Sequence, residues 1–231
     1  VVVGWGTRWL APMVPFHYED ALARRLVDSP EPEPTRVRST ALQVLADKVA
    51  ARMDLPAGMT VQIRYEPGDL VNAYATIGGR LRVYRGLIDK LDSEDALAAL
   101  LAHEIAHVRH RHVAASLGHA TAITLMLSVI SSEAGARAAG HMIGNAAGIV
   151  LLGYSRAQEE QSDDSALAAV VALYGHAGGV SGLFRTLTRV DEGEAGGIAL
   201  LRSHPLTQDR LDRLAARARQ RVRDIGQHPH R

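Results

Sequence analysis

The sequence contains no cysteine, which excludes both disulfide bonds and a metal site built on thiolates. Its 26 basic and 25 acidic side chains give a formal net charge of +1, so no overall charge favours nucleic acid or an acidic partner. Only 4% of the residues are aromatic. Without aromatic or motif support, the basic face near the C-terminus is interpreted as a solvated surface rather than a nucleic-acid site; it consists of Arg210, Arg213, Arg217 and Arg221.

Long uninterrupted hydrophobic runs are also missing. Two strongly apolar stretches, Thr121 to Ile130 and Ile143 to Leu152, are separated by Glu133, Arg137 and His141. Neither approaches the roughly 18 continuous apolar residues of a membrane-spanning helix. We therefore expect a helical hairpin packed beside the functional site, with a surface that dips into a membrane as the alternative.

The length of 231 residues and the abundance of alanine and leucine favour one mainly helical α+β domain with a small sheet. Apolar periodicity predicts a strand over 60–65 and a β-hairpin over 71–84, with Gly78-Gly79 as a two-residue turn that needs positive φ. A Gly-rich loop region is expected over 177–197, around one short helix. The predicted helices are 16–27, 35–53, 93–113, 158–173, 180–190 and 207–222.

Residues 1–34 are interpreted as an N-terminal extension and residues 35–231 as the main domain. The first ten residues are apolar and contain two tryptophans, a residue that favours the membrane interface. They suit the stump of a membrane-proximal segment, and an ordinary strand or coil is the equal alternative because the segment is far shorter than a ~20-residue span.

The stretch Ala96 to Val108 is apolar except for His103, Glu104 and His107. A helix that is apolar on almost all sides is a buried one, and buried polar groups cost free energy unless something satisfies them. The three residues form the pattern His-Glu-x-x-His, in which two imidazoles one turn apart can bind zinc and the glutamate can reach a catalytic water. The alternative is a pair of hydrogen-bonded core histidines with no metal.

A catalytic zinc usually takes three protein ligands, so one more is required. One zinc-peptidase pattern has a third histidine six residues after the second, with a glycine between them. It is excluded, because Val113 stands at the histidine position and His110 at the glycine position. His110 and His112 are expected to be exposed at the helix end. A carboxylate from another helix remains, and two pairs four residues apart share a face: Glu159 with Asp163, and Glu160 with Asp164. Periodicity does not choose between them.

Four motifs now resemble the HtpX and CAAX-prenyl-endopeptidase family of zinc metallopeptidases, with its soluble periplasmic BepA branch the most similar. The first two are the His-Glu-x-x-His helix and the segment Ser155 to Glu159 with Asp163. The other two are an Asn-Ala-Tyr-Ala hairpin with Gly78-Gly79 and Gly86-Leu87, and Ser203-His204-Pro205 with Arg210. They occur in the family's order from about Thr35 to Leu214.

The resemblance implies a zincin-type domain with one Zn²⁺ per chain, held by His103, His107 and Glu159, and with Asp163 supporting the ligands. It also implies that His204 reaches the zinc site and that a polypeptide substrate binds as an added strand along Asn72, Ala73, Tyr74 and Ala75. Tyr74, Ile77 and Ser162 depart from the family's usual Phe, Pro and Ala. These departures bear on local packing and substrate preference and not on the zinc chemistry that the resemblance implies.

The resulting hypothesis is a zinc-dependent endopeptidase that acts on misfolded or membrane and envelope proteins. Glu104 would act as general base and acid, and His204 would stabilise the oxyanion or hold the enzyme latent as a fourth zinc ligand. Arg210 would hold the loop that carries His204, the alternative being a surface arginine. The protein would be membrane-associated, with this domain in the periplasm or the cytoplasm. The alternative function is a non-proteolytic, zinc-stabilised, chaperone-like binding module.

Overall fold

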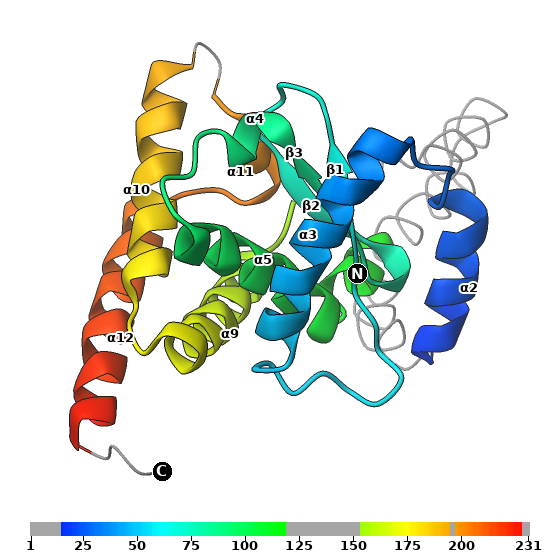
Figure 1. The fold of residues 1–231 in the computed structure, drawn as a ribbon. Coiled ribbons are helices and arrows are strands. Elements are labelled where there is room, and N and C mark those ends of the chain that lie inside the picture. Colours follow the sequence, from blue (N-terminus) through cyan, green and yellow to red (C-terminus); the bar gives the residue numbers. More distant parts are fainter. Residues whose placement is uncertain (1–14, 119–152, 195–196, 228–231) are drawn as a thin grey trace, which may run out of the picture.

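The computed structural model describes residues 15–118, 153–194 and 197–227. The two apolar stretches and the first ten residues lie outside this described part, and the boundary at residue 34 stays a prediction. Within it, helices surround a small three-stranded sheet (Figure 1), which confirms the mainly helical α+β class. The helices are α2 (Phe16–Leu26), α3 (Glu33–Ala50), α4 (Arg85–Ile88), α5 (Glu94–Arg109), α9 (Arg156–Tyr174), α10 (Gly178–Gly193), α11 (Ala199–Ser203) and α12 (Gln208–Gln227).

Helix α5 lies at the centre of the molecule (Figure 1), in contact with α3, α9, α10 and the sheet. Every side chain from Ala98 to Val108 is buried. The helix begins after Ser93, whose side chain accepts a hydrogen bond of 3.3 Å from the backbone N–H of Ala96 and so satisfies one of the free amides of the first turn. Apolar residues on all sides thus produce a helix that is covered on all sides. None of the helices that the structure describes is both long and apolar enough to cross a bilayer.

The sheet has the strand order β1-β3-β2, with β1 (Gln62–Glu66) parallel and β2 (Ala73–Thr76) antiparallel to β3 (Arg80–Tyr84). Strand β2 is therefore an edge strand among the described residues. Thr76 pairs with Arg80, so the connection is the three-residue turn η2 (Ile77–Gly79) rather than the expected two-residue turn. Its two glycines do have positive φ, 65° and 71°.

The tertiary structure explains why both residues of this turn are glycine. A Cβ at Gly79 would lie 2.0 Å from the carbonyl oxygen of Thr60, and one at Gly78 would lie 2.7 Å from the Cβ of Ala23 in α2. The turn therefore lies directly against α2 and the chain that enters β1. This packing fixes the position of the edge strand.

The expectation of a Gly-rich loop over 177–197 with one short helix was wrong, because α10 is a continuous helix from Gly178 to Gly193. Its second glycine serves packing rather than flexibility. A Cβ at Gly179 would lie 2.2 Å from the carbonyl oxygen of Asp95, so glycine allows α10 to approach the first turn of α5 closely.

The expectation of a single helix through Val113 was also wrong. Helix α5 ends at Arg109, and Arg111 has a left-handed backbone with φ of 60°. The chain is helical again over 112–118. The change of direction turns the residues after Arg111 back toward the core.

Candidate metal centre

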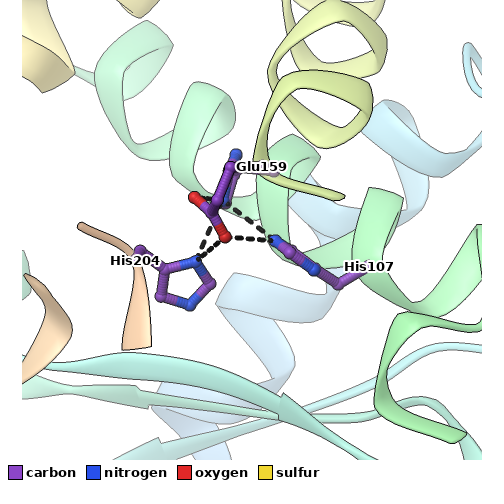
Figure 2. A group of neighbouring side chains, drawn as sticks. His107, Glu159 and His204 are labelled. Carbon is purple, nitrogen blue, oxygen red and sulfur yellow. Dashed lines mark hydrogen bonds and ion pairs between the residues drawn. The ribbon is translucent and has the colours of Figure 1, made fainter. Parts of the chain in front are cut away.

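Four buried side chains from three segments meet beside α5. His103 and His107 come from α5, Glu159 comes from the first turn of α9, and His204 follows α11. One nitrogen or oxygen from each lies within 4.8 Å of the others, and none of the four residues is more than 6% exposed. Figure 2 shows the rings of His107 and His204 directed at the carboxylate of Glu159.

The distances within this group fit one bound metal ion. His107 Nε2 lies 3.1 Å from His103 Nε2, and His204 Nδ1 lies 3.2 Å from His103 Nε2 and 2.9 Å from Glu159 Oε1. Four donors bound tetrahedrally to zinc at about 2.0–2.1 Å would be roughly 3.3–3.4 Å apart. Imidazole nitrogens that converge with a carboxylate oxygen are a donor set that zinc prefers.

The electrostatics of the site favour a carboxylate and a neutral imidazole as ligands. Burial opposes ionisation of Glu159, but hydrogen bonds from His103, His107 and His204 outweigh it and hold the pKa of that carboxyl far below its usual range. Burial lowers the pKa of His107 well below its ordinary value, which leaves the imidazole neutral with a lone pair to donate. Burial also acts to lower the pKa of His103, yet hydrogen bonds to Asp163 and Glu159 raise it to about 9.

A second layer of charged residues contacts the ligands. His103 Nδ1 lies 3.1 Å from Asp163 Oδ1, and Asp163 accepts hydrogen bonds of 2.7 and 2.8 Å from Nε and Nη2 of Arg210. Arg210 Nη1 also lies 2.6 Å from Glu159 Oε2 and donates to the carbonyl of Pro205, next to His204. Arg210 thus contacts the carboxylate of Glu159, the carboxylate of Asp163 beside His103, and the loop that carries His204.

This arrangement settles two questions that the sequence left open. Glu159 and Asp163 are the buried pair, at 3% and 1% exposure, and Glu160 is exposed. The interpretation of the basic face of α12 as wholly solvated was wrong, because Arg210 is buried and Arg213 donates a 3.1 Å hydrogen bond to Asp163. Buried carboxylates attract cations from a neighbouring helix, and the sequence alone did not show which helix lies there.

Glu104 is completely buried and lies between the metal group and the sheet edge. Its Oε2 accepts a 2.9 Å hydrogen bond from the backbone N–H of Ala75 in β2. Its Oε1 has no hydrogen-bond partner among the described residues and lies 3.6 Å from His204 Nε2, which is also unpartnered there. Burial raises the pKa of Glu104, which suits a group that takes up and returns a proton.

The segment expected to hold substrate lies along the same edge. Ala73 and Ala75 are buried and Tyr74 is half-buried, with its ring 6.4 Å from that of Tyr84. Asn72, just before β2, is buried, and its side-chain Oδ1 has no partner among the described residues. Of these four residues, Ala75 is the one bonded to Glu104.

Two residues beside the metal group, His112 and Tyr154, were not assigned to it from the sequence. His112 was expected to be exposed, but it is 5% exposed, and its Nδ1 lies 3.1 Å from His107 Nδ1. His110, expected to be exposed as well, is half-buried, with its Nε2 2.9 Å from the hydroxyl of Ser165. The ring of Tyr154 lies 3.8 Å from that of His107. The apolar periodicity of the sequence predicted neither the helix break before His112 nor the contact of His107 with Tyr154, which is 47 residues away in sequence.

A buried His-Glu-x-x-His helix, a glutamate from a second helix and an edge strand beside the glutamate of the motif together define a metallopeptidase site. Comparison with known sequences gives the family. The sequence profile of Peptidase family M48 matches residues 36–218. The chain belongs to peptidase family M48, and His103, His107 and Glu159 are its metal-ligand group.

Individual relatives agree with this assignment. The chain is 29% identical to Metalloprotease YcaL of Escherichia coli, over 64% of this chain and 58% of the relative. It is 26% identical to a beta-barrel assembly-enhancing protease of Yersinia pestis, over 70% of this chain and 34% of the relative, and 34% identical to a Protease HtpX homolog of Salinibacter ruber, over 49% and 41%. The matched segment thus spans between a third and three fifths of these relatives.

Proposed function

We propose that this chain is a zinc-dependent endopeptidase that binds one Zn²⁺ through His103, His107 and Glu159. The single observation that carries this proposal is the unpartnered Oε1 of Glu104, completely buried beside a group of metal-binding side chains. A structural metal site has no need for such a carboxylate, and an unpartnered buried oxygen costs free energy. A general base for a water molecule accounts for it.

The ion, when bound, would polarise the scissile carbonyl and acidify the attacking water. Glu104 takes the proton from that water and returns it to the leaving amine. The hydrogen bond from Ala75 to Oε2 leaves Oε1 to accept that proton. His204 Nε2, 3.6 Å from Glu104 Oε1, is placed to donate a hydrogen bond to the oxyanion.

The substrate is a polypeptide that adds as a strand at the edge of β2, beside the point where the N–H of Ala75 is bonded to Glu104. The edge position of β2 in the described sheet supports this, because an unpaired strand edge offers backbone donors and acceptors to an extended chain. The buried, unpartnered Oδ1 of Asn72 supplies a further acceptor for a substrate amide. The Yersinia pestis relative is named for beta-barrel assembly, and we propose misfolded or membrane and envelope proteins as the natural substrates, with the protein associated with a membrane.

His204 has a second role in this proposal, which is to hold the enzyme latent. Its Nδ1 completes the four-donor group, 2.9 Å from Glu159 Oε1. With a metal bound, His204 would be its fourth ligand and would have to leave for a substrate carbonyl to bind. Movement of the His204 loop would open the site and present Nε2 to the substrate.

The experiment measures zinc content and cleavage of unfolded casein for the wild type and Glu104→Gln. We expect one zinc per chain in both proteins, with cleavage reduced about 10²–10⁴-fold in the variant. The matched control is Glu160→Gln, an exposed carboxylate on α9, which should retain both properties. Zinc without cleavage in the wild type and in His204→Ala would instead favour a zinc-stabilised binding module. Absence of zinc after reconstitution would contradict the proposal.

A further inference from the structure

The segment after α5 holds a buried histidine that the catalytic proposal does not use. His112 is 5% exposed and lies against the outer side of the metal group. Its Nδ1 is 3.1 Å from His107 Nδ1, and its Nε2 is 3.0 Å from Gln161 Oε1 on α9. The hydroxyl of Ser162 lies 3.4 Å from the same Nδ1.

The protons of these groups can be placed from the chemistry of the ligand. His107 directs Nε2 into the metal group, and a neutral imidazole that binds metal through Nε2 carries its proton on Nδ1. The neighbouring Nδ1 of His112 must then be the acceptor, so the proton of His112 is on Nε2. That nitrogen faces Gln161 Oε1, an acceptor. The ring N–H groups of His107 and His112 thus each meet an acceptor, and the Ser162 hydroxyl, 3.4 Å from the same Nδ1, is the longer contact.

We propose that His112 is a positioning residue, which accepts the Nδ1 proton of His107 and fixes the ring that binds zinc through Nε2. The inference rests on the proposed function, since it takes His107 as a zinc ligand. The two ligand histidines are then supported differently. His103 is held by the carboxylate of Asp163, and His107 is held by a neutral imidazole. Because Glu104, Glu159 and Asp163 are already buried here, a neutral acceptor orients His107 without a fourth buried negative charge.

The backbone before His112 supports the same inference. A continuous helix would place a residue five positions after His107 on a different face, whereas the break returns His112 to it. Arg111 has φ of 60°, a conformation that is unfavourable for a residue with a side chain. Its Nε donates a 3.1 Å hydrogen bond to Glu19 on α2, and its guanidinium lies over the ring of Phe16. Strained backbone of this kind is retained where the surrounding structure stabilises it, commonly at functional sites.

The test is zinc affinity, measured by competition with a chromophoric chelator, for His112→Leu and His112→Asn. Asparagine places an oxygen near the position of Nδ1 and so keeps an acceptor, whereas leucine fills the volume without one. We expect leucine to weaken zinc binding by about 10–100-fold, and asparagine to stay close to the wild type. The control is His176→Leu, an exposed histidine just after α9.

Several outcomes would overturn the inference. Unchanged zinc affinity in His112→Leu, or equal losses in the leucine and asparagine variants, would show that His112 only fills space. A wild type that binds no zinc would remove the proposed function and this inference together. Should His112→Leu fail to fold, the exposed Gln161 replaces it: Gln161→Leu should weaken zinc binding and Gln161→Glu should not, and equal affinities would overturn the inference.

Discussion

The backbone N–H of Ala75 donates a 2.9 Å hydrogen bond to Oε2 of Glu104. This contact joins the edge strand to the central helix, so the substrate edge and the proposed general base are one structural unit. A displacement of β2 would therefore move the carboxylate as well as the edge. The neighbouring turn η2, held between α2 and the chain before β1, sets the position of both.

Substitution of Gly79 by alanine should destabilise the protein, because a Cβ there would lie 2.0 Å from the carbonyl oxygen of Thr60 at a φ of 71°. We expect a loss above the ~1–2 kcal/mol of a left-handed alanine alone, together with lower activity in the folded fraction. Urea unfolding measures the first effect. Gly175→Ala is the matched control, since it has a φ of 76° with nothing within 4 Å and should lose only the conformational part. Equal losses would contradict the role of the close contact.

Replacement of His204 by alanine separates its two proposed roles. Removal of a latent ligand should raise cleavage of loosely folded substrates, whereas removal of an oxyanion donor should lower it by about 10²–10³-fold. We expect a gain, because Nδ1 of His204 is already within the donor group. Cleavage of casein and of a short peptide is measured at equal zinc occupancy. No gain on either substrate would count against latency.

Asp163→Asn should weaken zinc binding by about 10–100-fold, because His103 loses its charged support. It should also lower the free energy of unfolding by about 1–3 kcal/mol, since the buried guanidinium of Arg210 loses one of its two carboxylate partners and retains Glu159. Thermal unfolding and chelator competition measure the two effects. Asp164→Asn, whose side chain is 37% exposed and pairs with Arg213 and Arg217, should cost no more than about 1 kcal/mol. Similar losses in both variants would contradict this layered arrangement.

Arg80→Met should destabilise the link between α2 and the sheet. The buried guanidinium donates hydrogen bonds of 3.0 and 2.7 Å to Asp28 and also pairs with Asp20. Loss of this cation should cost about 3 kcal/mol at neutral pH. The exposed pair of Arg85 and Asp69 supplies the control, since Arg85→Met should cost about 0–1 kcal/mol.

The cost of Arg80→Met should depend on pH. Hydrogen bonds to Arg80 hold the pKa values of Asp20 and Asp28 below their ordinary range. A carboxyl with a lowered pKa in the folded state stabilises above its unfolded pKa, about 3.9, and loses that contribution as pH falls through the folded value. The difference in the free energy of unfolding between wild type and variant should therefore be constant above about pH 5 and become smaller toward pH 3. A difference that grows on acidification would contradict the ion-pair explanation.

The sequence by itself determined the parts that repeat with a regular period. An apolar surround indicated that the His-Glu-x-x-His helix is buried, and two carboxylates four apart on another helix were the remaining ligand candidates. The alternation of apolar residues in 71–84 indicated a pair of strands, and the glycine pair indicated a turn with positive φ between them. These features follow from local geometry, because helix and strand periods decide which side chains share a face.

Only the tertiary structure decided which groups from distant segments meet. Glu159 rather than Glu160 faces the histidines because of how α9 packs on α5. Arg213 and His112, both expected at the surface, are directed inward because a neighbouring helix and a left-handed residue at Arg111 place them there. Buried charge and unpartnered polar atoms favour partners wherever the fold supplies them. Periodicity in the sequence predicts neither which distant residue becomes a partner nor where the helix breaks.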